Sequence, residues 1–137
     1  MAPSATIDMA EVVLTRELPP GPKSARAARA FVEATLREWG HADLIEVARL
    51  LTSELVTNAI LHAGTAIRVT VRVAEDRVRV EVEDRTGGTP TRLHHAVDAT
   101  TGRGLAIVEE IASSWGAQRT GSGKVVWFEM GAPGSGR

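Results

Sequence analysis

Two segments that alternate valine with polar residues constrain the fold of this chain more than any other feature. From Ile67 to Val73 and from Val78 to Val82, every second residue is valine or isoleucine, and Glu75–Asp76 supplies a turn between them. Since successive side chains of a strand point to opposite faces of a sheet, this spacing predicts an antiparallel hairpin with one apolar face. That face must be buried, so the rest of the chain is expected to cover one side of a sheet.

Two segments before the hairpin have the apolar spacing of helices that could cover it. Residues 23–39 repeat apolar side chains at three- and four-residue intervals, and Gly40 is expected to end that helix. A second helix is expected over residues 44–62. Its start is indicated by Asp43 and Glu46, which have the spacing of an N-cap with a reciprocal partner.

The remaining elements complete a sheet with helices on one face. A strand is expected at residues 11–18 and a final hairpin at residues 117–120 and 125–130, with a third helix that opens at Gly102–Gly104 and ends at Trp115–Gly116. The order is strand, helix, helix, two strands, long polar loop, helix, two strands. This order predicts an α+β fold, a two-layer α/β sandwich with a mainly antiparallel sheet.

Length and composition indicate one ordinary domain and exclude several classes of partner. Residues 11–130 are assigned to the domain, residues 1–10 to a flexible N-terminus and residues 131–137 to a flexible tail. The net charge of −1 argues against binding of nucleic acid, and no apolar run reaches the roughly 20 residues of a membrane span. The chain has no cysteine, and its N-terminus does not resemble a secretory signal, so a cytoplasmic location is expected.

Polar residues that could carry chemistry lie at the ends of three expected elements. Glu54 and Asn58 are one turn apart on one stripe of the second helix, and Asp84 ends the second strand of the valine hairpin. Gly102 and Gly104 open the third helix, where free backbone N–H groups favour an anion such as phosphate, although the third glycine of a dinucleotide fingerprint is absent. Each motif alone is more often a solvated face, a turn or a cap, so only the combination points to a site.

Two other features have an ordinary explanation beside a functional one. His94–His95 with Asp98 could bind a metal ion, but a polar loop explains them equally well and no third histidine lies nearby. Lys23, Arg26 and Arg29 give the first helix a basic beginning. This edge is either a solvated face or a docking edge for an acidic protein.

The combined motifs resemble those of the GHKL ATP-binding superfamily, which includes gyrase, Hsp90, histidine kinases and MutL. Residues 54–59 resemble its N box, Val82–Asp84 with Gly87–Gly88 resemble its first glycine box, and residues 102–105 resemble its second. The order of the motifs and the position of the intervening loop, which would be the ATP lid, also agree with that superfamily.

Within the superfamily, the chain is most similar to the anti-sigma-factor serine kinases. The similarity lies in the run Ser-Glu-Leu-Val-Thr-Asn-Ala at residues 53–59 and in Trp-Phe-Glu at residues 127–129. Regulatory ATP-binding proteins of actinobacteria are especially similar. The resemblance therefore implies a Bergerat-type ATP-binding fold with ATP and Mg²⁺ as ligands.

The resemblance also implies a role for each matching residue. Asn58 would coordinate the Mg²⁺ ion that bridges the phosphates, Asp84 would accept a hydrogen bond from the adenine amino group, and Glu54 would be the general base for a serine hydroxyl. Gly88 would let the backbone approach the base. Backbone N–H groups that face the phosphates would come from Gly102, Gly104 and Leu105.

Two hypotheses for the function follow from this resemblance. The first is a serine/threonine protein kinase that binds a sigma factor, phosphorylates an anti-sigma-factor antagonist and forms a homodimer. The second is a non-catalytic, nucleotide-gated module that sequesters a regulatory protein partner. It is motivated by two departures from the family pattern: Thr86 replaces the first glycine of a glycine box, and Lys124–Val125 stands where a threonine is expected to share the contact between Asp84 and adenine.

Overall fold

The elements of the fold follow the expected order along the chain. The computed structural model describes residues 11–63, 65–85, 108–121 and 123–131, with the backbone alone described at residues 61–63. The elements are β1 (Glu11–Leu18), α2 (Lys23–Glu38), the 3-10 helix η1 (Ala42–Leu44), α3 (Ile45–Ala63), β2 (Ile67–Ala74), β3 (Arg77–Asp84), β4 (Ser114–Arg119) and β5 (Lys124–Gly131). Residues 108–111 are also helical.

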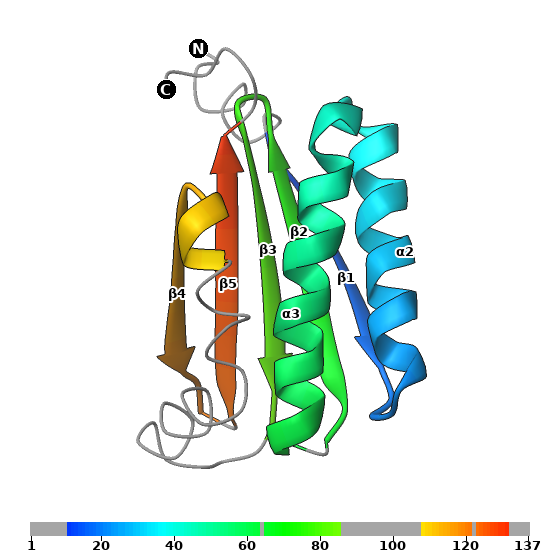
Figure 1. Ribbon diagram of the computed structural model, residues 1–137, viewed down its shortest axis with the longest axis vertical. Helices are drawn as coiled ribbons and strands as arrows, with labels where there is room; N and C mark the ends of the chain where they lie inside the picture. The colour runs from blue at the N-terminus through cyan, green and yellow to red at the C-terminus, as the bar shows by residue number, and fades with distance from the viewer. Residues whose placement is uncertain (1–10, 64, 86–107, 122, 132–137) are drawn as a thin grey trace, which may run out of the picture.

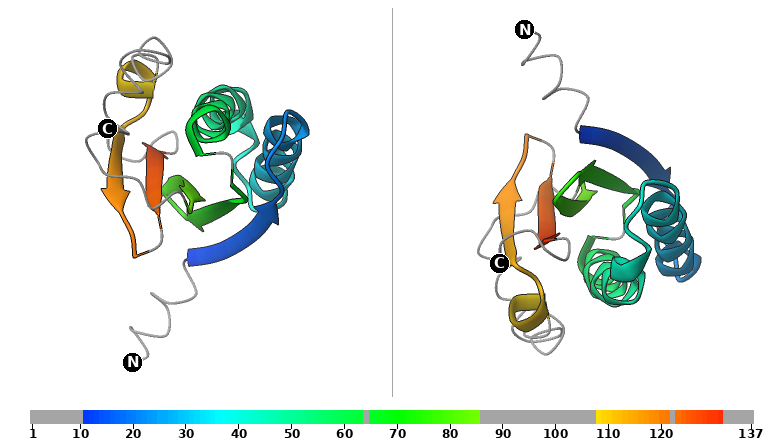
Figure 2. Two further views of the ribbon diagram at one scale, coloured as in Figure 1. Left: turned by 90° about the horizontal axis from the view of Figure 1, so that it is seen from below. Right: turned by 90° about the horizontal axis from the view of Figure 1, so that it is seen from above.

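The strands form one five-stranded sheet in the order β1-β2-β3-β5-β4, and each neighbouring pair is antiparallel. Helices α2 and α3 lie side by side over one face, and the helical residues 108–111 lie over the same face near β4 and β5 (Figures 1 and 2). The structure is therefore the predicted α+β sandwich, and it is consistent with the Bergerat ATPase fold.

The core lies between the helices and the alternating valines of the sheet. In β3, Val78, Val80 and Val82 are all buried, as the spacing of the valines predicts. The apolar stripe of α3 packs onto this surface with Leu51 and Leu55, which are at most 1% exposed. The hairpin β2–β3 and the second helix thus confirm the two predictions from which the fold class was derived.

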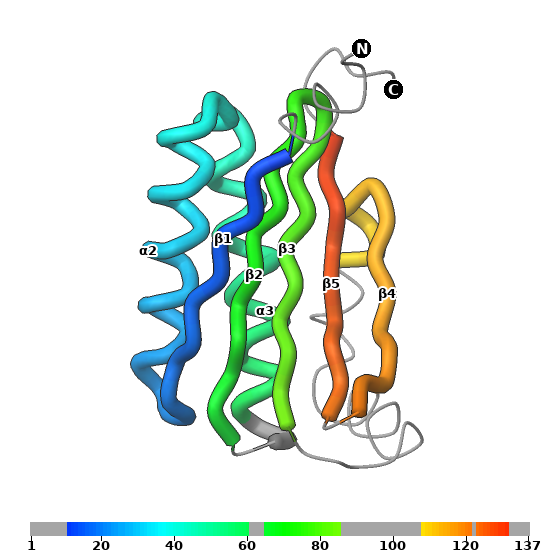
Figure 3. The backbone as a smooth tube through the Cα atoms, turned by 180° about the vertical axis from the view of Figure 1, so that it is seen from behind, coloured from blue at the N-terminus to red at the C-terminus, as the bar shows by residue number. Residues whose placement is uncertain are grey.

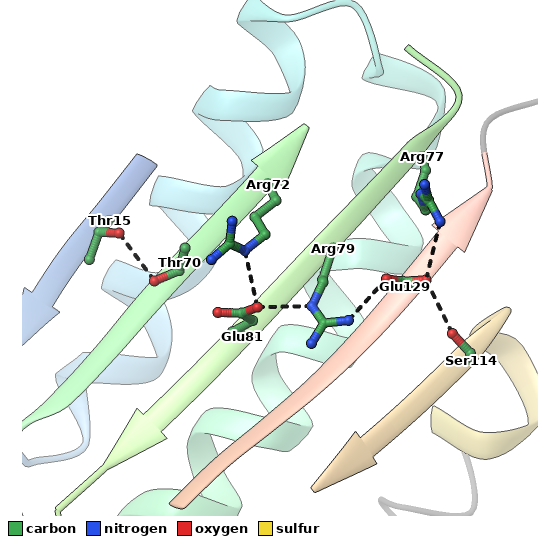
Figure 4. Close-up of polar contacts among 8 residues, drawn as sticks. All are labelled: Thr15, Thr70, Arg72, Arg77, Arg79, Glu81, Ser114 and Glu129. Atoms are coloured by element: carbon green, nitrogen blue, oxygen red, sulfur yellow. Dashed lines mark hydrogen bonds and ion pairs between the residues drawn. The ribbon is translucent and has the colours of Figure 1, made fainter. Parts of the chain in front are cut away.

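No described element covers the opposite face of the sheet (Figure 3). Charged side chains line this face. On this face Glu81 accepts hydrogen bonds from Arg72 at 3.1 Å and from Arg79 at 2.8 Å, and Arg79 also donates to Glu129 at 3.0 Å (Figure 4). The guanidinium of Arg79 lies 3.9 Å from the ring centroid of Trp127, a cation–π contact. These contacts explain why arginine and glutamate alternate with the buried valines.

A similar ion pair lies at the edge of the sheet between β1 and β2. Arg68 donates to Glu17 at 2.9 Å, and Arg85 approaches Glu17 to 3.5 Å. The hydrogen bond from Arg68, with the charges of Arg68 and Arg85, holds the pKa of Glu17 below its usual range. The Glu17 side chain is exposed, so this pair contributes little to stability.

The C-terminus of α2 confirms the predicted role of Gly40. Gly40 has a φ of +89°, in the left-handed region that glycine adopts without strain. The N–H of His41 donates to the carbonyl of Leu36 at 2.8 Å, which is the bond of a Schellman cap. The buried His41 ring then lies with Nε2 2.9 Å from the carbonyl oxygen of Ala74 and joins this cap to the turn between β2 and β3.

Two predicted boundaries are wrong. Trp115–Gly116 does not end a helix but lies within β4, where Gly116 pairs with Trp127. A Cβ atom at Gly116 would lie 2.7 Å from the ring of Trp127, so a larger residue here would have to displace this ring. Asp43 lies inside η1 and does not directly precede α3, so it is not the N-cap that its spacing to Glu46 indicated.

Two adjacent leucines of α3 provide a test of the core. Leu51 is 0% exposed, whereas Leu50 is 41% exposed. Leu51→Ala should lower the free energy of unfolding by about 3 kcal/mol because it leaves a cavity between helix and sheet. Leu50→Ala is the matched control and should change it by less than about 1 kcal/mol in chemical denaturation. Equal losses in the two variants would contradict the packing of α3 on the sheet.

Candidate functional site

Three elements bring buried polar side chains to the same end of the molecule. The C-terminal half of α3, the end of β3 and the start of β5 lie together at the lower end of Figure 1. Asn58 and Asp84 are each 2% exposed, and Lys124 is 7% exposed. Polar groups with so little exposure are costly unless they are paired or used, so this end of the helix-covered face is the candidate site.

The position of Asn58 follows from the apolar stripe of α3. Leu55 and Ala59 are buried against the sheet, and Asn58 lies beside them on the helix surface, so its amide is buried with them. Glu54, one turn earlier, is partly exposed, and Thr57 is exposed. The helix therefore holds a buried amide next to a carboxylate that solvent can reach, whereas the ordinary expectation for Asn58 was a solvated helix residue.

Asp84 and Lys124 form the closest ion pair described at this end of the sheet. They are direct cross-strand neighbours at the end of β3 and the start of β5. The ammonium of Lys124 lies 2.7 Å from Oδ2 of Asp84, and both side chains are buried. Two charges so far from water are tolerated because each is the partner of the other.

The ion pair shows what occupies the position of the expected threonine. The resemblance had identified Lys124–Val125 only as a missing hydroxyl, whereas the structure places a cation there. Sequence reasoning had one signal that could have found it. The alternation of the final strand puts Lys124 on the same face as the buried Val126 and Phe128, which predicts a buried lysine.

The turn between β4 and β5 packs directly onto the end of β3. Thr120 and Gly123 close this turn, since each backbone N–H donates to an oxygen of the other residue at 2.9 Å. A Cβ atom at Gly123 would lie 1.9 Å from the carbonyl oxygen of Asp84 and 2.6 Å from the Cα atom of Arg85. Only glycine permits this approach, so Gly123 fixes the backbone of Asp84 against the hairpin.

Several predicted site residues belong to the parts of the chain between the described ranges. Gly88, Gly102, Gly104 and Leu105 lie outside the described residues, as do Thr86 and the pair His94–His95. Residues 108–111, later in the chain, are helical, and Val108 is completely buried in the core. Of the predicted site, the structure thus buries Asn58 on α3 and Asp84 at the end of β3, with Glu54 one helical turn from Asn58.

The donor set at this end suits a magnesium–nucleotide complex. The amide of Asn58 offers a hard oxygen, and Mg²⁺ is usually held by one or two protein oxygens together with water and substrate phosphates. Within the described part of the chain, no group of three His, Cys, Asp or Glu residues could hold a metal ion by itself. The amide oxygen of Asn58 therefore fits a metal ion that is held together with substrate phosphates.

The groove on the opposite face is a weaker candidate for an anionic ligand. It is lined by Glu11, Arg72, Ala74, Arg77, Arg79, Glu81 and Glu129. Its arginines lie within 4.0 Å of glutamates, so their charge is already compensated. We therefore assign the site to the helix-covered face.

The basic beginning of α2 is only partly a solvated face. Lys23 and Arg26 are exposed, whereas Arg29 donates to the Ser53 hydroxyl at 2.9 Å and so joins α2 to α3 next to Glu54.

Among the described helices, none is long and apolar enough to cross a membrane.

Comparison with known proteins agrees with this geometry. A family model described as a histidine kinase-like ATPase domain matches residues 18–130, which is most of the chain. No curated protein matches the chain. The matched range contains α3, the end of β3 and the start of β5, and therefore the whole candidate site.

Proposed function

Since the chain belongs to the histidine kinase-like ATPase family, we propose that it is a cytoplasmic ATP-dependent serine/threonine protein kinase that acts as an anti-sigma factor. It would bind a sigma factor and phosphorylate an anti-sigma-factor antagonist. The observation that carries the proposal is the pair of buried polar residues, Asn58 on α3 and Asp84 at the end of β3, on one face of the sheet.

Each described residue has a chemical task in this proposal. The amide oxygen of Asn58 would hold Mg²⁺, which when bound neutralises the charge of the phosphates. Asp84 would accept a hydrogen bond from the base. Glu54 is partly exposed, so a serine hydroxyl of another protein could reach it, and its carboxylate would accept the hydroxyl proton. The phosphates would be bound by the backbone at Gly102, Gly104 and Leu105, as the resemblance implies.

The kinase proposal predicts that Glu54 and Asn58 can be separated by experiment. Glu54→Gln keeps the size of the side chain but removes the base, so phosphate transfer should fall by about 100-fold or more while ATP binding is retained. Transfer is measured with radiolabelled ATP and an anti-sigma-factor antagonist protein as the acceptor. Glu46→Gln, at an exposed position of the same helix, is the matched control. Full transfer by the Glu54 variant would remove Glu54 from the mechanism.

A second candidate function is supported by the ion pair of Lys124 with Asp84. Because the carboxylate of Asp84 is already paired with a buried ammonium, a nucleotide would bind in a pose that does not support phosphate transfer. The chain would then be a nucleotide-gated module that sequesters its protein partner. Calorimetry distinguishes the two functions, since nucleotide-dependent binding of the partner without any phosphate transfer favours the module.

A further inference from the structure

The cations of the described chain that lack an ion pair are concentrated where β1 ends and α2 begins. Most described arginines lie within 4.0 Å of a glutamate, and Lys124 is paired with Asp84. Among the described residues, the cations without such a pair are Arg16, Lys23, Arg26, Arg29 and Arg119. All of these except Arg119 belong to the segment 16–29, which therefore carries uncompensated positive charge.

The stability of α2 does not explain these cations. Lys23 and Arg26 lie in the first turn of α2, whereas the positive end of the helix dipole favours acidic side chains there. That turn contains no acidic residue, and the N-cap Pro22 makes no side-chain cap. Both cations are exposed, so they are available to a negatively charged partner.

A pocket with mostly apolar walls lies beside the same cations. It has a volume of about 300 Å³, and it lies between the end of β1 and the first turns of α2. Its walls include Leu18, Pro19, Pro20, Pro22, Lys23 and Ala27. Lys23 thus lines the pocket, and Arg26 directly precedes Ala27 on the helix. The segment 16–29 therefore combines an apolar hollow with exposed positive charge.

The shape of this pocket is determined by the chain itself. The prolines fix their own φ angles, and Gly21 has a φ of +140°, a conformation that other residues rarely adopt. The Ser24 hydroxyl donates to the carbonyl of Pro19, and the N–H of Ser24 donates to the carbonyl of Gly21 at 3.1 Å. The proline segment is thus fastened to the first turn of α2. A pocket that is formed before binding requires little ordering when a ligand enters.

We propose that the segment 16–29 docks a protein segment in which acidic side chains flank an apolar side chain. The apolar side chain would fill the pocket, and the acidic side chains would pair with Lys23 and Arg26. Phosphates of a nucleic acid would match the charge but would leave the apolar pocket empty. A lipid surface takes up apolar side chains that protrude from a protein, whereas the apolar groups here line a hollow.

This docking surface lies at the same end of the molecule as the candidate site. Helix α2 begins where α3 ends, at the lower end of Figure 1. Arg29 joins the two helices through its hydrogen bond of 2.9 Å to Ser53. The inference does not depend on the nucleotide site and is tested without nucleotide, so its failure is distinguishable from the failure of the proposed function.

The test is an NMR titration of the labelled full-length chain with short capped peptides. The probes are Asp-Glu-Leu-Glu-Asp, the same peptide with glycine in place of leucine, and Lys-Arg-Leu-Arg-Lys. The acidic leucine peptide should shift the backbone signals of Gly21, Lys23 and Ala27. It should bind about tenfold more tightly than the glycine peptide, because leucine fills the pocket. The basic peptide should shift none of these signals.

Variants separate the charge from the pocket. Arg26→Glu should weaken the binding of the acidic leucine peptide by about fivefold or more at low ionic strength. Arg119→Glu changes an exposed arginine on β4 and should leave the binding unchanged. Ala27→Leu should fill the pocket and remove the preference for leucine over glycine, whereas Ala30→Leu, at an exposed position of α2, should keep it.

The ratio of the two acidic peptides within one protein does not depend on the folded fraction, so a destabilised variant remains informative. Equal binding of these peptides by the wild-type chain would overturn the inference, because the pocket would then be unused. Equal losses in Arg26→Glu and Arg119→Glu would also overturn it, since attraction would then follow net charge alone. No response to either acidic peptide, with sedimentation on phosphatidylglycerol vesicles that Arg26→Glu abolishes, would assign the cations to a lipid surface instead.

Discussion

Asn58→Ala is expected to weaken the binding of ATP with Mg²⁺ by about 100-fold or more, or roughly 3 kcal/mol. Asn58 is the described residue whose amide oxygen suits the metal ion, and it is 2% exposed on the helix that packs against the sheet. Alanine removes the oxygen but keeps the helix, since alanine is the best helix former. The loss should be largest with Mg²⁺ present and should shrink when the metal is chelated.

The neighbouring residue provides the control for this result. Thr57 is exposed on the same helical turn, so Thr57→Ala changes the surface without changing the buried side. Both variants are titrated with ATP by calorimetry, in Mg²⁺ and in a chelator. Retention of full magnesium-dependent binding by Asn58→Ala would show that another group holds the metal and would remove Asn58 from the site.

Gly123→Ala is expected to destabilise the chain by about 4 kcal/mol or more, which is exceptional for a single methyl group. The added Cβ atom would lie 1.9 Å from the carbonyl oxygen of Asp84, and the obstacle is backbone, which cannot rotate away as a side chain can. The turn between β4 and β5 must therefore move off the end of β3. This movement would also disturb the ion pair of Lys124 with Asp84 and thus the candidate site.

A second glycine of the same turn is the matched control. A Cβ atom at Gly121 would meet nothing within 4 Å, so Gly121→Ala should change the free energy of unfolding by less than about 1 kcal/mol. Chemical denaturation of both variants provides the comparison. Nearly equal stability of the two variants would contradict the close approach of this turn to β3.

The fold could be predicted where one local pattern determines one element. The valines of β2 and β3 specify two strands and the face that they bury. Gly40 ends α2 with a positive φ, which glycine adopts without strain. The prediction that Trp115–Gly116 ends a helix is wrong, because Gly116 lies in a strand against the ring of Trp127 on the paired strand. A contact between strands is not visible in the residues that flank the glycine.

The site could be predicted only in part, for the same physical reason. Asn58 and Asp84 were identified from motifs, yet their burial depends on how α3 and β3 pack together. Lys124 lies 40 positions after Asp84 in the chain, and the register of β3 with β5 makes them neighbours. The motif indicated a missing threonine and the alternation of the final strand indicates a buried lysine, whereas the contact of that lysine with Asp84 follows only from the paired strands.

The most direct test of the central claim is an NMR titration of the labelled chain with ATP and Mg²⁺, followed through its backbone amide signals. The site on the helix-covered face predicts that the signals of Asn58, Asp84 and Lys124 shift with saturation. The signals of Arg79 and Trp127 on the opposite face should stay in place, as should the indole N–H of Trp127. Shifts confined to Arg79 and Trp127, or no shifts at all, would contradict the assignment of an ATP site to Asn58 and Asp84.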